Sequence, residues 1–192
     1  MGNDGIRAGD GEAGDGALAA LALSGRQPAY RALMERHREP VYRLVRAQVD
    51  DADAALDITQ ESFIAAFAYL HRYDPGRPFR FWIMRIALNK CRDWRRRRTV
   101  RNFFSRAKPM EEGVHVADVA PGPEAEAAGR QELARARRAM DALPENLRSV
   151  LLLRAVEGMS QTDVAALLDL SEKAVETRLY RARIKLTEML RD

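Results

Sequence analysis

Residues 144–190 read PENLRSVLLLRAVEGMSQTDVAALLDLSEKAVETRLYRARIKLTEML, and this stretch predicts two helices joined by a tight turn after an opening helix. Pro144 suits the start of the opening helix, because its fixed φ is helical and its missing N–H is not needed there. Ser160 with Asp163 resembles a capping box, and Ser171 can cap the last helix. The pattern favours a helix-turn-helix, although the spacing alone also fits an ordinary helical hairpin.

The last helix has an apolar face and a polar face when its residues are projected at about 100° each. The residues expected to point inward are Val175, Leu179, Ala182 and Leu186. The opposite side and its flank combine a hydroxyl, a phenol and cations, supplied by Thr177, Tyr180, Lys173, Arg178, Arg181 and Lys185. Such groups suit base edges and phosphates in a major groove. A solvated helix that pairs with its own glutamates is the alternative.

Helical periodicity also covers residues 25–99, where we expect four helices. Pro40 is predicted to close the first and to open the second. The third carries an apolar stripe of Leu56, Phe63, Phe67 and Leu70. Outside that stripe it displays a polar patch with one apolar residue, made of Asp57, Gln60, Glu61 and Ile64. This patch suits docking onto a basic helical partner, and plain solvated surface is the alternative.

The fourth helix, residues 79–98, combines arginines with aromatic residues. One face carries Arg85, Asn89 and Arg92, and a run of arginines follows from Arg95 to Arg98. Arginines with interleaved aromatics can follow a nucleic-acid backbone and stack unpaired bases, at ~1–3 kcal/mol per base. The alternatives are a solvated helix end for the arginines and a core position for the tryptophans, which we favour for Trp82.

Strand signals are nearly absent, so we predict an all-α fold of two small helical domains joined by a flexible linker. Residues 1–24 are rich in glycine and acids, which predicts a disordered tail. Residues 25–99 form the first domain, a helical bundle, and 130–192 form the second, with the helix-turn-helix. Residues 100–129 lack periodicity and include three prolines, which is typical of a linker.

Two strings carry a family resemblance. DITQESFIAAFAYLHRYDPGRPFRFWIMRIALNKCRDWRRRR, at 57–98, resembles region 2 of sigma factors of the extracytoplasmic-function (ECF) group within the sigma-70 type. LPENLRSVLLLRAVEGMSQTDVAALLDLSEKAVETRLYRARIKL, at 143–186, resembles their region 4. The resemblance covers about residues 25–99 and 130–190 in the family's order. More loosely, the first string is similar to the subgroup that includes metal-resistance sigma factors.

The resemblance implies a transcription-initiation subunit that binds core RNA polymerase, at the coiled coil of its largest subunit and at its flap region. It assigns the coiled-coil contact to Asp57, Gln60, Glu61 and Ile64. It assigns the promoter −10 element, duplex and then melted, to Arg85, Asn89, Arg92, Arg95 and Arg96, with the loop 72–79 capturing a flipped base. It assigns the −35 element to Lys173, Glu176, Thr177, Arg178, Tyr180, Arg181 and Arg183.

One of these positions departs from the family pattern, and the family implies one further partner. Many members carry a basic residue where this chain has Glu176, which puts a phosphate or guanine contact there in doubt. A carboxylate at that place could still accept a hydrogen bond from a cytosine amine. Members of the family are usually held inactive by an anti-sigma factor, so we expect such a partner here.

Other classes of function find less support in the sequence. No apolar run reaches the ~18 residues of a membrane span, and a single cysteine, Cys91, excludes an internal disulfide, so we expect a cytoplasmic protein without stable membrane insertion. The histidines and Cys91 form no zinc pattern, so we predict no metal site, no cofactor and no catalytic residue. Two alternatives stay open. One is an operator-binding regulator, and the other is a metal-dependent nuclease that uses Asp50, Asp51, Asp53 and Asp57.

Overall fold

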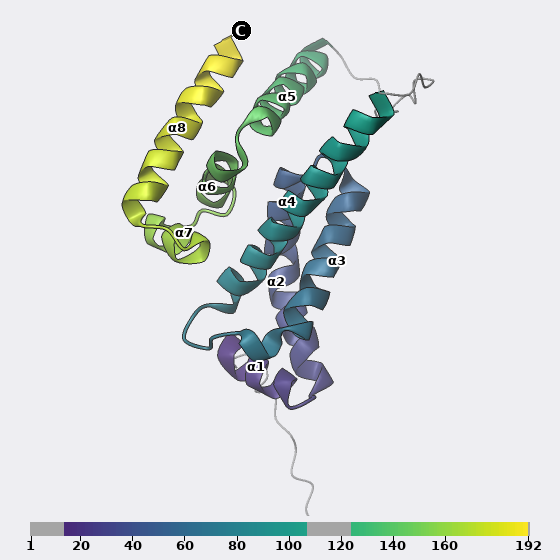
Figure 1. The fold of residues 1–192 in the computed structure, drawn as a ribbon, viewed down its shortest axis with the longest axis vertical. Coiled ribbons are helices and arrows are strands. Elements are labelled where there is room, and N and C mark those ends of the chain that lie inside the picture. The colour runs from purple at the N-terminus through teal and green to yellow at the C-terminus, as the bar shows by residue number, and fades with distance from the viewer. Residues whose placement is uncertain (1–13, 107–123, 192) are drawn as a thin grey trace, which may run out of the picture.

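The structure, a computed structural model, describes residues 14–106 and 124–191 (Figure 1). All regular structure in these two ranges is helical, which confirms the all-α prediction. The helices are α1 (Asp15–Leu23), α2 (Gln27–Gln48), α3 (Ala52–Ala68), the short 3-10 helix η1 (Leu70–Arg72), α4 (Phe79–Arg106), α5 (Glu124–Ala142), α6 (Glu145–Ala155), α7 (Gln161–Leu168) and α8 (Glu172–Arg191).

Helix α2 runs through Pro40 as one element of 22 residues, so the predicted helix boundary at Pro40 is wrong. A proline inside a helix removes one backbone hydrogen bond and costs about 3 kcal/mol. The helix compensates by burying one continuous face on both sides of the proline, with Leu33 before it and Val41 and Leu44 after it fully buried. The free energy gained by burying these side chains therefore outweighs the local cost of a proline inside the helix.

The predicted disordered tail, residues 1–24, needs correction over its second half. Residues 1–13 lie outside the described residues, but 15–23 form α1, which packs against α2. Leu18 and Ala22 are buried there, and Asp15 accepts hydrogen bonds from Arg36 at 2.5 Å and pairs with His37 at 2.8 Å. The segment ALAALAL supplies enough apolar surface to offset the entropy of ordering it.

His37 makes the contact between α1 and α2 sensitive to pH. Burial lowers the pKa of His37 below its ordinary value of 6.5, and this effect outweighs Asp15, which raises the pKa. The unfolded chain therefore binds a proton more readily than the folded chain, and the stability present above pH 6.5 is lost as the pH falls below it. We expect the free energy of unfolding, measured in urea, to decrease from pH 7.5 to about 5.5 by less in His37→Gln than in the parent chain. An equal decrease in both proteins would contradict this assignment.

The predicted linker, residues 100–129, is helical at both ends. Helix α4 continues through residues 100–106, and α5 already begins at Glu124. No proline or glycine stands between Phe79 and Arg106, so nothing in the backbone ends α4 where its apolar pattern fades. The remaining linker prediction, at 107–123, lies outside the described residues.

The helix-turn-helix forms as predicted. Ser160 and Asp163 make both bonds of the capping box at the start of α7, and the Ser171 hydroxyl accepts from the Ala174 N–H at 3.2 Å. Asp169 ends α7 with a φ of 58°, in the left-handed region that a short aspartate side chain tolerates. The turn therefore directs α8 back across α6, as their contact shows.

The two halves of the chain lie side by side rather than apart (Figure 1). We call the helices α1–α4 the first module and α5–α8 the second module. Helix α7 packs against α4, and α6 packs against α2. Most buried apolar residues, from both modules, belong to one cluster, in which Leu88 of α4 and Leu167 of α7 take part. A smaller cluster of Leu143, Leu147, Leu151 and Ala182 lies within the second module.

Candidate nucleic-acid interface

Four of the predicted −10 residues form one exposed stripe along α4. Arg85, Asn89, Arg92 and Arg96 are all exposed and follow one another at spacings of three or four residues. Arg95 projects about 80° away from Arg85 around the helix. Its Nε donates to the backbone oxygen of Gln48 at 2.8 Å, and its Nη2 pairs with Asp141 at 2.7 Å. The structure therefore brings four of the five residues together and gives Arg95 different partners.

A cavity of about 410 Å³ opens beside this stripe, at the loop 72–79, to which the family resemblance assigns base capture. Its walls include Tyr73, Phe81 and Trp82, and Arg85 and Asn89 lie at the same cavity. The loop is held in place because Tyr73 donates its hydroxyl hydrogen to the backbone oxygen of Arg77 at 2.7 Å. Aromatic walls beside an amide offer stacking surface and a hydrogen-bond pair, which is what an unstacked base requires.

The two tryptophans of α4 are half-buried and line a second groove, of about 490 Å³, between α3 and α4. Trp82 packs against the core, as favoured from the sequence, but its Nε1 finds no hydrogen-bond acceptor among the described residues. Arg98 lies over the ring of Trp94 at 5.1 Å from the centroid. Lys90 at the same groove pairs with Glu61 at 2.9 Å. The groove thus joins a cationic, aromatic wall to an acidic one.

The predicted polymerase-binding patch is exposed on α3. Asp57, Gln60, Glu61 and Ile64 all face solvent, and Ile64 is 68% exposed. An exposed isoleucine within a polar patch can supply the apolar contact of a docking surface. Leu56, about two turns earlier on α3, is 44% exposed.

Helix α8 has the two faces that its sequence predicts. Val175 and Ala182 are fully buried, and Leu179 and Leu186 pack against the smaller cluster. The predicted −35 residues lie off this buried face, and they are the exposed Lys173, Glu176, Tyr180, Arg181 and Arg183 with the half-buried Thr177 and Arg178. Lys173 pairs with Glu176 at 2.9 Å, which explains how a carboxylate is accommodated among the cations.

Sequence reasoning missed a pair of charged residues that join the two modules. Arg80 of α4 pairs with Glu157, just after α6, at 2.8 Å, and Arg43 of α2 lies 3.6 Å from the same carboxylate oxygen. The Glu157 side chain has no solvent exposure. No local pattern could reveal this pair because its members are 77 residues apart in the sequence.

Two acids of the nuclease alternative have structural roles. Asp51 caps α3, since its carboxylate accepts from the Ala54 N–H at 3.0 Å, and Asp50 pairs with Arg137 at 3.0 Å. In the part of the chain that the structure describes, no three His, Cys, Asp or Glu side chains gather closely enough to hold a metal ion. Nor is any helix there both long and apolar enough to cross a membrane.

Comparisons with known proteins agree with this geometry. The family model described as "Sigma-70 region 2" matches residues 33–101, and the one described as "Sigma-70, region 4" matches 133–186. The RNA polymerase sigma factor CnrH of Cupriavidus metallidurans is 43% identical over 183 residues, which cover 93% of this chain and 95% of that protein. The ECF RNA polymerase sigma factor SigE of Mycolicibacterium smegmatis is 30% identical, covering 98% and 72% of the two chains.

A solved structure supports the same conclusion. The structure of CnrH in complex with the cytosolic domain of CnrY matches with a TM-score of 0.67 and 37% identity, and it covers 92% of this chain and 96% of that one.

The two region matches, in this order on one chain, define a sigma-70-type initiation factor. With the relatives above, the chain belongs to the extracytoplasmic-function group of RNA polymerase sigma factors, which are transcription-initiation factors and not enzymes. The alternative of an operator-binding regulator is therefore not favoured, because it would leave the match to sigma-70 region 2 unexplained.

Proposed function

We propose that this sigma factor divides promoter recognition between its modules. Residues 25–99, within the first module, bind core RNA polymerase and the −10 element. Residues 130–192, which include most of the second module, bind the −35 element, and residues 100–129 connect the two. The observation that carries this division is the pair of exposed cationic surfaces, one along α4 and one along α8, on two modules that match different sigma regions. The protein acts in the cytoplasm, where its polymerase is.

Polymerase binding is proposed for the exposed patch on α3. Ile64 supplies the apolar contact, and Asp57, Gln60 and Glu61 surround it with acceptors for a basic coiled coil of the largest subunit. An apolar centre with a polar rim is the usual anatomy of a protein interface. The second module is proposed to contact the flap region of the polymerase.

Recognition of the −10 element is proposed for the α4 stripe and the cavity beside it. Arg85, Arg92 and Arg96 neutralise phosphates, and Asn89 hydrogen-bonds the edge of a base that has left the stack. Tyr73 and Phe81 supply the walls on which that base stacks. Each captured base offsets part of the cost of melting the duplex, so binding favours the open promoter.

Recognition of the −35 element is proposed for α8 in the major groove. Arg178, Arg181 and Arg183 contact phosphates or guanine, and Tyr180 and Thr177 lie at the centre of the exposed side. Lys173 and Glu176 form an ion pair, which DNA either breaks on binding or contacts while the pair stays intact. When the ion pair is broken, Glu176 can accept a hydrogen bond from a cytosine amine.

Regulation by an anti-sigma factor is proposed from the family. The solved relative CnrH is seen in complex with the cytosolic domain of CnrY. We propose that a partner of this kind covers the polymerase- and DNA-binding faces of this chain.

Footprinting tests the division of labour. Run-off transcription of genomic fragments, with core polymerase and this chain, identifies a promoter for the experiment. On that promoter we expect the holoenzyme to protect two separate regions upstream of the start site and to make bases near the start site reactive to permanganate. A single protected region, with no reactive bases, would contradict the proposal.

An Arg181→Ala variant should weaken binding of the second module to the −35 region by about fivefold. It should also lower the slope of log affinity against log salt concentration by about one, because one fewer phosphate is neutralised. The reason is that Arg181 is exposed on the cationic flank of α8, where it can neutralise one phosphate. The measurement is a filter-binding titration of holoenzyme on that promoter at several salt concentrations. Arg191→Ala, about 15 Å further along the same helix, is the matched control and should change neither quantity. Equal effects of the two variants would contradict the placement of α8.

A further inference from the structure

Helix α1 lies against the loop 72–79, which borders the cavity proposed for base capture. It contacts η1, the short helix that leads into this loop. Gly16 of α1 also faces the loop, since a Cβ at Gly16 would lie 3.7 Å from the Cβ of Pro75. The match to sigma-70 region 2 begins at residue 33, so it leaves α1 outside. The contact with the loop therefore indicates a role for α1 that the family match does not cover.

The loop is held together by its own hydrogen bonds. The Tyr73 hydroxyl donates to the backbone oxygen of Arg77 at 2.7 Å. The Gly76 N–H donates to the Asp74 carboxylate at 2.9 Å, and the Arg77 N–H donates to the Asp74 backbone oxygen at 3.0 Å. A loop with these internal bonds moves as a unit, so its position at the cavity depends on the surface against which it packs.

Tyr73 connects that surface to the cavity. Its side chain forms part of the cavity wall, and the residue is only 8% exposed. Its ring packs edge-on against Phe79, with the ring centroids 5.4 Å apart and the planes at 80°. Phe79 is fully buried at the start of α4. Because an edge-to-face pair has a preferred geometry, a displacement of Phe79 displaces the cavity wall with it.

His37 of α2 packs against Phe79 as well. The two ring centroids are 5.3 Å apart, with the planes at 43°. The imidazole is buried, and its Nε2 donates to one carboxylate oxygen of Asp15 at 2.8 Å, while the other oxygen accepts from Arg36 at 2.5 Å. Contacts therefore run without a gap from the carboxylate of α1, through the two buried rings, to the cavity wall at Tyr73.

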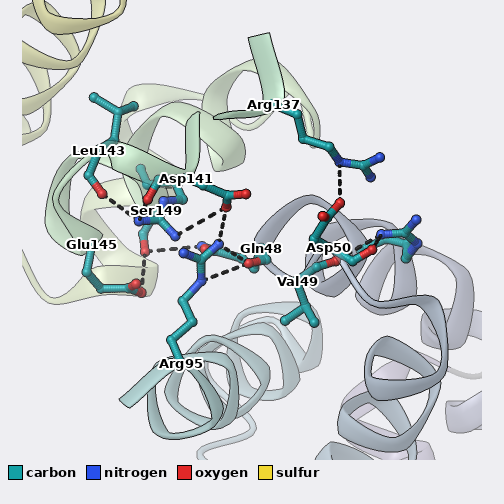
Figure 2. A network of polar contacts seen from close by, with 11 residues as sticks. Gln48, Val49, Asp50, Arg95, Arg137, Asp141, Leu143, Glu145 and Ser149 are labelled. Atoms are coloured by element: carbon teal, nitrogen blue, oxygen red, sulfur yellow. Dashed lines mark hydrogen bonds and ion pairs between the residues drawn. The ribbon is translucent and has the colours of Figure 1, made fainter. Parts of the chain in front are cut away.

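The arginine and asparagine stripe on α4 has anchors of its own. Arg95 Nε donates to the backbone oxygen of Gln48 at the end of α2, and Arg95 Nη2 pairs with Asp141 of α5 (Figure 2). These contacts lie four turns along α4 from Phe79. A change at α1 is therefore expected to move the loop while Arg85 and Asn89 keep their places.

The environment of His37 links this chain of contacts to pH. Burial is the largest effect and lowers the pKa of His37 below 6.5, Asp15 of α1 raises it, and Arg36 of α2 and Arg80 of α4 lower it. The ring thus takes up a proton more readily when it leaves its buried position. The packed arrangement keeps its stability above pH 6.5 and loses it as the pH falls below that value.

We propose that α1 is a brace for the base-capture loop, and that Asp15 and His37 are positioning residues that hold the aromatic wall of the cavity in the geometry that binds a flipped base. The proposal rests on the proposed function of the cavity beside Asn89. The brace acts on base capture and leaves polymerase binding through α3 unchanged. It also makes base capture weaker in mildly acidic solution.

The test measures how much the captured base contributes to DNA binding by the holoenzyme. The probe is a fluorescein-labelled single strand that carries the −10 element of the promoter identified by run-off transcription. The reference is the same strand with an abasic site at the position where removal of a base weakens binding by the parent holoenzyme most. We call the ratio of the two affinities the base ratio. It reports base capture, because both strands share the phosphate contacts.

Four variants of the full chain separate the brace from a general change of charge. Asp15→Ala removes the acceptor for His37, and Asp15→Asn keeps an oxygen acceptor without the charge. Gly16→Phe places a large side chain against Pro75 and leaves the charges as they are. Glu35→Ala is the matched control for the loss of one acid, at an exposed position of α2 for which the described residues show no ion pair.

We expect a base ratio of about 10 for the parent chain at pH 7.5. Asp15→Ala and Gly16→Phe should lower it to about 2, whereas Asp15→Asn and Glu35→Ala should keep the parent value. The affinity of each holoenzyme for the abasic strand, and of each chain for core polymerase, should stay within about twofold of the parent value.

A second arm of the experiment varies the pH and uses only the parent chain and His37→Gln. The glutamine amide can donate to Asp15 but does not titrate. From pH 7.5 to about 6.0 we expect the base ratio of the parent to fall by about threefold and that of His37→Gln to stay constant. This arm also decides the matter if a substitution in α1 prevents folding, which thermal unfolding detects. A purely structural role of His37 would give both proteins the same pH profile.

The proposal is overturned if Asp15→Ala and Gly16→Phe keep the parent base ratio, or if the parent and His37→Gln respond alike to pH. It is also overturned if Asp15→Ala lowers polymerase affinity as much as it lowers the base ratio. If no abasic site weakens binding by the parent holoenzyme, the proposed function of the cavity is itself contradicted. A parent that depends on the base, with variants that do so equally, contradicts the brace alone.

Discussion

An Ile64→Asp variant is expected to lose affinity for core RNA polymerase by about 30-fold or more while unfolding at the temperature of the parent chain. Ile64 is 68% exposed, so its substitution leaves no cavity and removes little from the core. In the complex, its side chain would be buried, which is worth ~1.5–3 kcal/mol, and an aspartate there would be buried without a partner. Affinity is measured by fluorescence anisotropy of the labelled sigma factor, and stability by thermal unfolding.

Leu23→Asp is the matched control for Ile64. Leu23 is 53% exposed at the end of α1, and the same substitution there makes the same change of charge at another exposed apolar residue. We expect its polymerase affinity to stay within about twofold of the parent value. Polymerase binding that falls equally in both variants would mean that α3 is not the docking surface.

An Asn89→Ala variant is expected to reduce promoter opening by about tenfold while polymerase affinity stays nearly unchanged. Asn89 is exposed on the α4 stripe and lines the cavity that Tyr73 and Trp82 wall. A buried base edge that loses its amide partner keeps its desolvation cost, and one good bidentate contact is worth ~1–3 kcal/mol. Opening is measured by permanganate reactivity on the promoter identified by run-off transcription.

Asn146→Ala makes the same chemical change in the second module. Asn146, at the start of α6, lines together with Asn89 a cavity of about 500 Å³ between the modules, and it belongs to none of the proposed contact sets. We expect the Asn146→Ala variant to open promoters to the same extent as the parent chain. If Asn89→Ala lowered polymerase affinity as much as it lowered opening, the α4 surface would have been assigned to the wrong partner.

Local features of the fold could be predicted because a few neighbouring residues encode them. The caps at Ser160 and Ser171 and the buried face of α8 with Val175 and Ala182 need only the helical period and a hydrogen bond three residues away. The exposure of Asp57, Gln60, Glu61 and Ile64 follows from the same period.

Features that depend on distant partners could not be predicted. The helix boundary expected at Pro40 is absent because burial on both sides of the proline outweighs its local cost. Leu56 falls on the apolar stripe by spacing but is 44% exposed in the first turns of α3. Arg95 looked like its neighbours in the arginine run, and only the folded chain places Gln48 and Asp141 beside it.

We propose that two modules of one chain bind a promoter while the first is attached to RNA polymerase. The most direct measurement is run-off transcription with purified core polymerase of the same host and this chain, on genomic fragments, with co-elution of the two proteins recorded in parallel. We predict co-elution and discrete transcripts whose upstream sequences share two elements at a fixed spacing. Failure of the purified chain to co-elute with core polymerase, in the absence of any inhibitor, would contradict the account.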